Sequence, residues 1–491
     1  MRRRGRLQTA GPISDNLAMT RPLLICGVAL ALSGVAGLPA PAGGERLLPQ
    51  KPEPARIVVP GEVRALPGAL DSTPVLNSNC PEIVQTEGIL DSTFPPGGMK
   101  TPQAHLNLPL KGRIDVFAHH IARAPSEQDL RTLYLGLIVH NPSKRRVRVR
   151  VLSGASYLSQ PDAPFVTMPA LLPNDDGRLY SGPGDRVTDD VLRGRRQEGL
   201  PASLVLAAGA DEMLVNLPVP VRQLKPPLNG RSVLLKLKTD APVYLASLAM
   251  YAPADGQGKE RAPTLAEWRK LLVEGALAGP REGEPTVPGA VGDFRYGRVA
   301  GVSRGSRWLA KIDDPQPHRS GLHIPEPGQS YSYILSAVDR KTLGTGQVQC
   351  AELLRRYPDT AYSAHGNYAV HYQLTFPLYN PAGERRKVLL EFETPAGSDG
   401  HGLIYNDPPG NRIFFRGTVR LSWRKATRAV QSEYFHLSEN EGEIVPPLAS
   451  FTLGPKEHKT VVVDFIYPPD ATPPQVITVR TASAAESTGT W

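Results

Sequence analysis

Three residues with metal-binding side chains lie close together in the sequence: Asp115, His119 and, slightly earlier, His105. Imidazole nitrogens and carboxylate oxygens are common ligands of zinc. Adjacent residues of a β-strand point to opposite faces, so His119 and its neighbour His120 cannot bind one ion from the same face, whereas Asp115 and His119 share a face. We therefore take Asp115, His119 and His105 as a candidate metal site. The alternative, and the usual role of such residues, is that these are structural or surface histidines.

The segment Gly301-Val-Ser303-Arg-Gly305 matches the G-x-S-x-G pattern of serine hydrolases. That pattern presents a nucleophile where a strand leads into the Ser and a helix follows it, on a parallel sheet. The residues after Gly305 do not begin a helix, so we interpret the segment as a hairpin turn and assign no catalytic residue. The chain lacks zinc-protease and EF-hand motifs. No cofactor is predicted, and binding of calcium or another divalent ion is kept as an alternative.

Arginines alternate with valines in the segment from Arg146 to Val151. A period of two, with β-branched residues on one side, predicts a half-buried strand whose arginine side faces solvent. Arg146, Arg148 and Arg150 would then form a row on one face. We consider two interpretations of this row, a solvated face and a surface that binds an anionic ligand.

The chain has three cysteines, too few for a disulfide-rich scaffold or a cysteine-rich zinc module. Cys26 falls in an N-terminal leader, which leaves Cys80 and Cys350. An even number of cysteines in an oxidising compartment favours pairing, so Cys80 and Cys350 are a candidate disulfide. Two separate thiols are the alternative.

Residues 1–42 have the features of a secretory signal peptide. Arg21 precedes an uncharged apolar run that ends at Leu38, and Ala40 and Ala42 are the small residues expected before a cleavage site. The run is shorter than the roughly 20 residues that span a bilayer. We therefore expect an extracytoplasmic protein, in the periplasm, on the outer surface or secreted, with no transmembrane segment after cleavage.

The charge and composition exclude some classes of protein. The formal charge is +9, and it falls to +5 when five arginines and Asp15 are removed with the leader. This small excess does not indicate a nucleic-acid partner. With 50 Pro, 46 Gly and 40% hydrophobic residues, the chain should be folded and rich in turns. Met19 could be the true start, because the residues before it add nothing that a signal needs.

Two stretches of the chain share a layout, which suggests a diverged duplication. A strand pattern ends in His140-Asn141-Pro142 in the first stretch and in Tyr379-Asn380-Pro381 in the second. Short strands separated by turn signals every ten or so residues are typical of β-sandwiches. We therefore predict a mainly β protein with two related β-sandwich (immunoglobulin-like) units, an extended N-terminal arm and one helix between the units.

The predicted helix covers residues 264–275. Thr264 and Glu267 form a capping-box pattern, and Leu265 and Trp268 lie on its apolar face. The predicted boundaries are a signal peptide at 1–42, an arm at 43–104, a first unit at 105–255, a connecting region at 256–364, a second unit at 365–482 and a flexible tail at 483–491.

Four blocks of the sequence resemble a known family. They are Leu70–Asn79, Phe117–Pro125, Tyr357–Tyr362 and Tyr467–Gln475. These blocks are similar to those of exported cyanobacterial proteins grouped as domain-of-unknown-function family 3370. The resemblance implies a cyanobacterial source and an extracytoplasmic location, and it implies no activity.

These observations predict an exported envelope or secreted protein that is not an enzyme and acts by binding or structural contact. The expected partner is cell-wall or extracellular polysaccharide, and no oligomeric state is predicted. Phe414, Phe415 and Trp423, or Tyr357 and Tyr362, are candidates for stacking on sugar rings. The alternative is an extracytoplasmic hydrolase, either polysaccharide-directed or metal-assisted.

Overall fold

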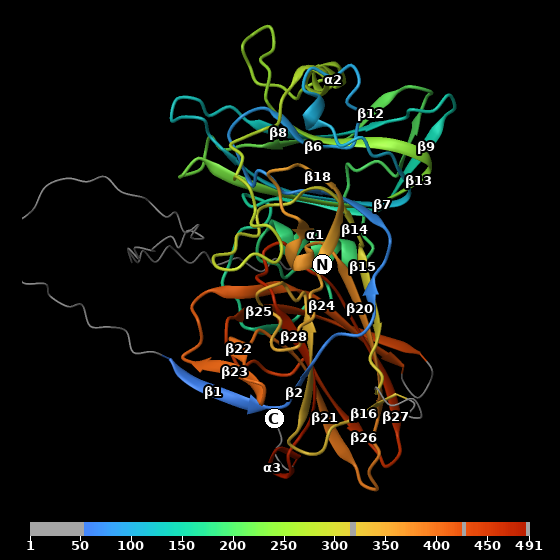
Figure 1. The fold of residues 1–491 in the computed structure, drawn as a ribbon, viewed down its shortest axis with the longest axis vertical. Helices are drawn as coiled ribbons and strands as arrows, with labels where there is room; N and C mark the ends of the chain where they lie inside the picture. The colour runs from blue at the N-terminus through green and yellow to red at the C-terminus, as the bar shows by residue number, and fades with distance from the viewer. Residues whose placement is uncertain (1–53, 315–320, 425–428, 488–491) are drawn as a thin grey trace, which may run out of the picture. The chain divides into compact units, whose positions relative to one another are not determined.

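The structure, a computed structural model, describes residues 54–314, 321–424 and 429–487. The predicted signal peptide, with Met19 and Cys26, lies outside these residues. The described chain is mainly β-strand in several sheets, which confirms the predicted mainly β class (Figure 1). None of the helices in the described ranges combines the length and the apolar composition needed to cross a membrane.

One long strand organises the first half of the described chain. β13 (Leu228–Tyr251) has 24 residues, and its pairing is interrupted about midway. The first part pairs with β7 (Leu110–Arg123) and β9 (Val147–Leu158), and the second part pairs with β6 (Gly88–Ser92) and β8 (Leu133–His140). One hydrophobic cluster takes side chains from both parts, so the core of this half lies between them.

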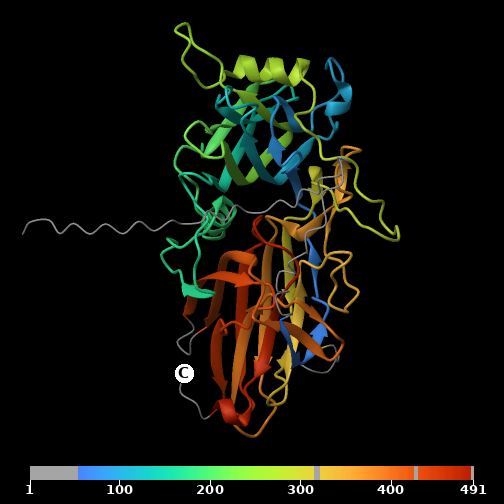
Figure 2. The same ribbon diagram turned by 90° about the vertical axis from the view of Figure 1, so that its left-hand side faces the viewer.

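The second half contains an eight-stranded and a five-stranded sheet. Three neighbouring strands of the larger sheet are β24 (Ile413–Arg424), β27 (His458–Ile466) and β20 (His371–Tyr379). In the smaller sheet, β28 (Gln475–Thr481) pairs with β21 (Arg386–Glu393). A second hydrophobic cluster contains side chains from both sheets. Figure 2 shows the strands of this half, in orange and red, side by side in the lower part of the view.

The segment predicted as an extended arm contributes strands to more than one sheet. β2 (Glu62–Arg64) pairs with β17 (Ser330–Leu335) in the five-stranded sheet. β4 (Pro74–Ser78) lies between β7 and β14 (Ala300–Arg304) in the sheet of the first half. The backbone of this segment therefore has its hydrogen bonds satisfied by strands from distant parts of the chain.

The two halves contain strands that pair in the same way. β8 pairs with β12 (Asp211–Val219) as β20 pairs with β27. β9 pairs with β11 (Ser203–Leu206) as β21 pairs with β26 (Ala449–Leu453). An Asn-Pro dipeptide directly follows β8, at Asn141, and another directly follows β20, at Asn380.

Two helices cover sheet surfaces. α2 (Leu265–Glu274) is the predicted helix, and it begins with the predicted capping box of Thr264 and Glu267. Its Trp268 is buried against Gly136, where a Cβ atom would come within 2.9 Å of the indole. α1 (Pro183–Leu192) was not predicted. It contacts β9 and β13 of the first half and β24 and β27 of the second half, so it joins the two cores.

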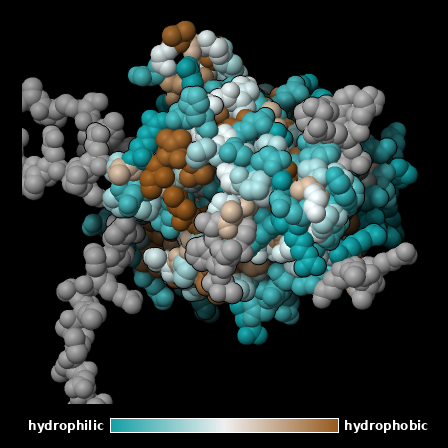
Figure 3. Space-filling view, turned by 90° about the horizontal axis from the view of Figure 1, so that it is seen from below, coloured by the Kyte–Doolittle hydropathy of each residue, from teal (hydrophilic) through white to brown (hydrophobic). Residues whose placement is uncertain are grey.

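β1 (Ala55–Pro60) pairs with β23 (Gly402–Asp407) and is one of the two edge strands of a three-stranded sheet. Its Ile57 and Val58 are partly exposed. Figure 3, a view from below, shows a mostly hydrophilic face with one compact group of hydrophobic residues. Exposed apolar side chains are normal on folded proteins, and we base no site on them.

Candidate functional site

Arg146, Arg148 and Arg150 are exposed, as the alternating pattern predicts. The valines between them, Val147 and Val149, are fully buried in the core of the first half. The strand is therefore amphipathic, and burial of the valines holds the arginines on the outer face of the sheet.

Strand pairing adds two further cations to this row. Arg150 lies opposite Lys238 on β13, and Lys238 lies opposite Arg113 on β7, so three cations are direct neighbours across three strands. Lys238 and Arg113 are exposed as well. We call this surface the basic face and define it as Arg113, Arg146, Arg148, Arg150 and Lys238. Sequence reasoning missed Lys238 and Arg113, because their place in the row depends on long-range pairing.

Among the described residues, no carboxylate lies within ion-pair distance of a side chain on the basic face. The carboxylate of Asp240 on β13 accepts a hydrogen bond from the backbone N–H of Arg148. Like charges directly opposite each other on paired strands are destabilising. The positive charge of the basic face therefore has no acidic partner on the described part of the chain and is accessible to an anionic ligand.

The other end of the same sheet surface is covered. Phe117 lies on the same side of β7 as Arg113, and it packs in a cluster with Val187 and Val191 of α1. Between these two regions, Lys236 and Asp115 form an ion pair with a 2.6 Å Nζ–Oδ2 distance. The outer face of this sheet is thus covered by α1 near Phe117 and exposed to solvent near Arg113, where it is basic.

The structure does not bring the predicted metal ligands together. Asp115 pairs with Lys236, the Nδ1 atom of His119 lies 2.8 Å from the Ser232 hydroxyl, and the Nδ1 atom of His105 lies 2.9 Å from the Ser92 hydroxyl. Burial lowers the pKa of His105 to about 4 and also lowers the pKa of His119. These histidines are buried and hydrogen-bonded to serines, which agrees with the structural alternative.

Ser303 lies within strand β14, between β4 and β18 (Ala351–Arg356), rather than in a hairpin turn. Its side chain is buried, and neither a strand-to-helix turn nor a parallel neighbour surrounds it. The local structure therefore does not form the nucleophile elbow that the G-x-S-x-G pattern requires.

The two described cysteines are free thiols in the structure, so the predicted Cys80–Cys350 disulfide is not present. Cys80 is buried beside Ala300 and Tyr357. Cys350 lies elsewhere, close to Asp339 and His365. The two thiols thus have separate surroundings, which agrees with the alternative of unpaired cysteines.

Most of the aromatic residues proposed for sugar stacking belong to the core. Tyr357 and Phe415 are almost fully buried, and Phe414 is only 8% exposed. Trp423 is half-buried against Phe451, and the Tyr362 ring is covered by the Arg356 guanidinium. These side chains therefore do not form an exposed aromatic row, and binding of a polymer would depend more on charge than on stacking.

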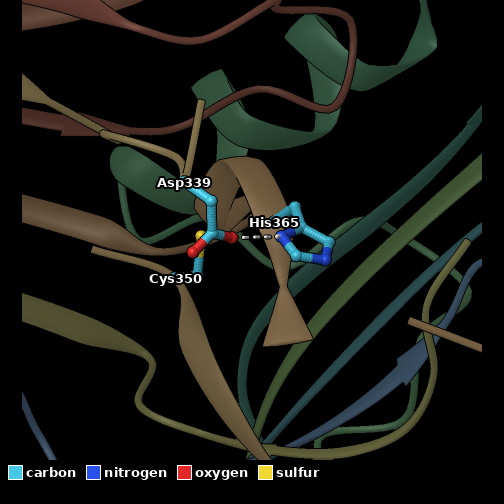
Figure 4. Close-up of side chains that lie close together, drawn as sticks. All are labelled: Asp339, Cys350 and His365. Carbon is cyan, nitrogen blue, oxygen red and sulfur yellow. Dashed lines mark ion pairs between the residues drawn. The ribbon is translucent and has the colours of Figure 1, made fainter. Parts of the chain in front are cut away.

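Asp339, Cys350 and His365 form a cluster of metal-ligand side chains that the sequence analysis did not identify (Figure 4). Their ligand atoms all lie within 4.8 Å of one another. Burial raises the pKa of the Cys350 thiol to about 12, and burial lowers the pKa of His365 to about 4. Asp339 lies in a turn, Cys350 directly precedes β18 and His365 begins a short 3-10 helix, so no sequence spacing could have indicated the cluster.

His365 also lines a cavity of about 550 Å³. The cavity wall includes four cationic side chains and the acid Glu282. The cations are Arg295, Arg298, Arg340 and Lys341. Arg298 is paired with Glu82 and Glu282, so part of this positive charge is compensated.

The fold and these sites define a mainly β protein with an exposed basic sheet face and a separate cluster of potential metal ligands. Residues 61–481 match the family model described as "Protein of unknown function (DUF3370)", and the chain belongs to that family. The resemblance noted from the sequence is thereby confirmed at the level of the family, and the cyanobacterial source stays a prediction.

No curated protein matches the chain. Among solved structures, the chain is similar to the "Crystal structure of Lac15 from a marine microbial metagenome", with 11% sequence identity and a TM-score of 0.11. The match covers 82% of this chain and 61% of that chain, so it spans less than two thirds of the Lac15 chain. A TM-score this low carries no argument about fold or function.

Proposed function

We propose that this protein is an exported, non-catalytic binding protein that holds an acidic polysaccharide of the cell envelope or extracellular matrix on its basic face. The observation that carries the proposal is the row Arg113–Lys238–Arg150, in which like charges face each other across three paired strands. Such repulsion is unfavourable in the free protein and is relieved by a polyanion.

The geometry of the row suits an extended polymer. Neighbouring strands are about 4.8 Å apart, so three cations on adjacent strands extend over roughly 10 Å. Arg146 and Arg148 extend the surface along β9 in the perpendicular direction. Repeated carboxylates or sulfates on a polysaccharide could contact several of these side chains at once, and many weak contacts add up to stable attachment.

We further propose that the two halves are diverged copies of one β-sandwich unit. The equivalent strand pairings, and the Asn-Pro dipeptide after the first strand of each set, support this duplication. The immunoglobulin-like type and the extracytoplasmic location stay parts of the proposal.

The proposal is tested with a matched pair of polymers. The purified protein is applied to an immobilised acidic polysaccharide, such as polygalacturonate, and to the same polymer with its carboxyl groups esterified. We expect retention on the acidic form, release as the salt concentration rises, and little retention on the ester. Equal retention on both forms, or none on a panel of acidic polymers, would refute the proposal. Release of shorter chains from the polymer would support the hydrolase alternative instead.

A further inference from the structure

The cluster of Asp339, Cys350 and His365 is formed by three short segments that are joined by hydrogen bonds. Gln349, next to Cys350, donates its backbone N–H to the carbonyl of Ala337. Asn367, two residues after His365, donates its side-chain Nδ2 to the carbonyl of Gln349. The backbone positions of the three residues are therefore fixed independently of any ligand, as a preorganised site requires.

A second set of bonds closes this frame. The hydroxyl of Ser336 donates to the carbonyl of Gly366, which links the segment before Asp339 to the segment of His365. The backbone N–H of Ala351 donates to Oδ1 of Asn367, which links the segment of Cys350 to that of His365. Each pair of segments is thus connected directly.

The side chains point toward one another within this frame (Figure 4). The Nδ1 atom of His365 lies 4.0 Å from Oδ2 of Asp339, which is too long for a hydrogen bond. That Nδ1 atom is buried and has no hydrogen-bond partner. A buried polar atom without a partner is costly, and it marks a position where a ligand would be stabilising.

The distances suit a tetrahedral ion. Zinc binds sulfur at about 2.3 Å and nitrogen or oxygen at about 2.0–2.2 Å, which places tetrahedral donors roughly 3.3–3.8 Å apart. The ligand atoms here lie within 4.8 Å, so closure requires a movement of about 1 Å. Asp339 is 43% exposed and is the side chain that is free to make this movement.

We infer that Asp339, Cys350 and His365 form a binding site for a divalent transition-metal ion of the zinc type. One thiolate, one imidazole and one carboxylate form a mixed ligand set that zinc accepts and that calcium and magnesium do not favour. Water completes the coordination. On binding, the S–H bond of Cys350 breaks, a metal–sulfur bond forms and one proton is released to solvent.

The ion would lie at the wall of the cavity that His365 lines. This inference does not rest on the proposed polysaccharide binding, because none of the three residues belongs to the basic face. The two proposals can therefore fail separately, and the probe for this one is the metal ion alone.

Cobalt(II) titration of the purified, reduced and chelator-treated protein tests the site. Thiolate ligation gives a charge-transfer absorption band, and a tetrahedral site gives intense visible bands. We expect both to saturate at one ion per chain, to disappear when zinc is added, and to be accompanied by release of one proton. Absence of these bands, or of their displacement by zinc, would overturn the inference.

Variants identify the ligands. Cys350→Ser should abolish the charge-transfer band, and Asp339→Asn should weaken zinc binding at least about tenfold. Asp339 is half exposed, so its variant tests the site even if Cys350→Ser fails to fold. Cys80→Ala and His401→Gln, the matched controls, should bind as the original protein does. A band that persists in Cys350→Ser, or that is lost equally in Cys80→Ala, would contradict the assignment.

Discussion

Asn141 and Asn380 make the same set of hydrogen bonds in the two halves of the protein. The Nδ2 atom of Asn141 donates to the carbonyls of Arg145, Leu206 and Ala207. The Nδ2 atom of Asn380 donates to the carbonyls of Glu384, Leu453 and Gly454. In the first half the Asn141 amide thus joins the turn after β8 to the end of β11. In the second half the Asn380 amide joins the turn after β20 to the end of β26 in the same way. This equivalence is the strongest structural support for the proposed duplication.

Replacing either asparagine should destabilise the protein to a similar extent. Asn141→Ala and Asn380→Ala each remove three hydrogen bonds to carbonyl groups, so each should lower the free energy of unfolding by about 2–4 kcal/mol. Urea denaturation measures the change. Asn411→Ala, at an exposed position, is the control and should change it by less than about 0.5 kcal/mol. Losses as small as the control's at either site would contradict the structural role of the amide.

The stability of the protein should also depend on the buried pair of Asp185 and His436. Asp185 lies on α1 and His436 on β25 (Val430–Asn440), both side chains are fully buried, and their Oδ2 and Nε2 atoms are 2.8 Å apart. Removing one partner of a buried pair leaves the other uncompensated, at a cost of about 3–5 kcal/mol. We expect His436→Leu and Asp185→Leu each to be strongly destabilising.

A double-mutant cycle separates the interaction of Asp185 and His436 from general damage to the core. The variant with both residues replaced by Leu should lose clearly less stability than the sum of the single losses. Additive losses in thermal or urea unfolding would show that the two side chains do not stabilise each other.

Asp91 should make stability depend on pH. Burial raises its pKa to about 7, against the lowering effect of the hydrogen bonds from the backbone N–H groups of Gly301 and Ser92. The pKa of an aspartate in an unfolded chain is about 3.9. Between about pH 4 and 7 the folded state therefore binds one proton more than the unfolded state. The stability that Asp91 contributes is therefore present at low pH and is lost as the pH rises through this range.

The variant Asp91→Asn isolates this effect, because its amide cannot ionise. Relative to Asp91→Asn, the original protein should lose roughly 2–4 kcal/mol of unfolding free energy between pH 4 and pH 7. Asp293→Asn, at an exposed position away from the basic face, is the control and should leave the pH profile unchanged. Parallel pH profiles for the original protein and Asp91→Asn would show that Asp91 titrates normally.

Local patterns in the sequence predicted the local features of the structure. The alternation from Arg146 to Val151 placed the arginines on an exposed face, because a strand with a period of two has only one buried side. The capping box at Thr264 and Glu267 located the start of α2, since both of its bonds form within one turn. The short helix α1 was missed because packing between the two cores stabilises it more than its Gly- and Asp-containing sequence does.

The sites depend on contacts that no local pattern encodes. Lys238 joins Arg150 and Arg113 only through the pairing of three strands that are far apart in the sequence. Asp339, Cys350 and His365 meet because hydrogen bonds from Gln349, Asn367 and Ser336 join the three segments that carry them. In contrast, the proximity of His105, Asp115 and His119 in sequence predicted a site that the fold does not assemble, since each side chain has a different partner.

The most direct test of the proposed function compares two triple variants with the same change in charge. One carries Arg113→Gln, Arg150→Gln and Lys238→Gln on the basic face. The other carries Lys259→Gln, Lys270→Gln and Arg355→Gln, at exposed positions elsewhere. The measurement is the dissociation constant for a soluble acidic polysaccharide at one fixed, low ionic strength. Our account predicts that the basic-face variant binds at least about tenfold more weakly, a change of about 1.4 kcal/mol, and that the control binds within about twofold of the original protein. Equal weakening in the two variants would contradict it, because binding would then follow net charge rather than the row of cations across the three strands.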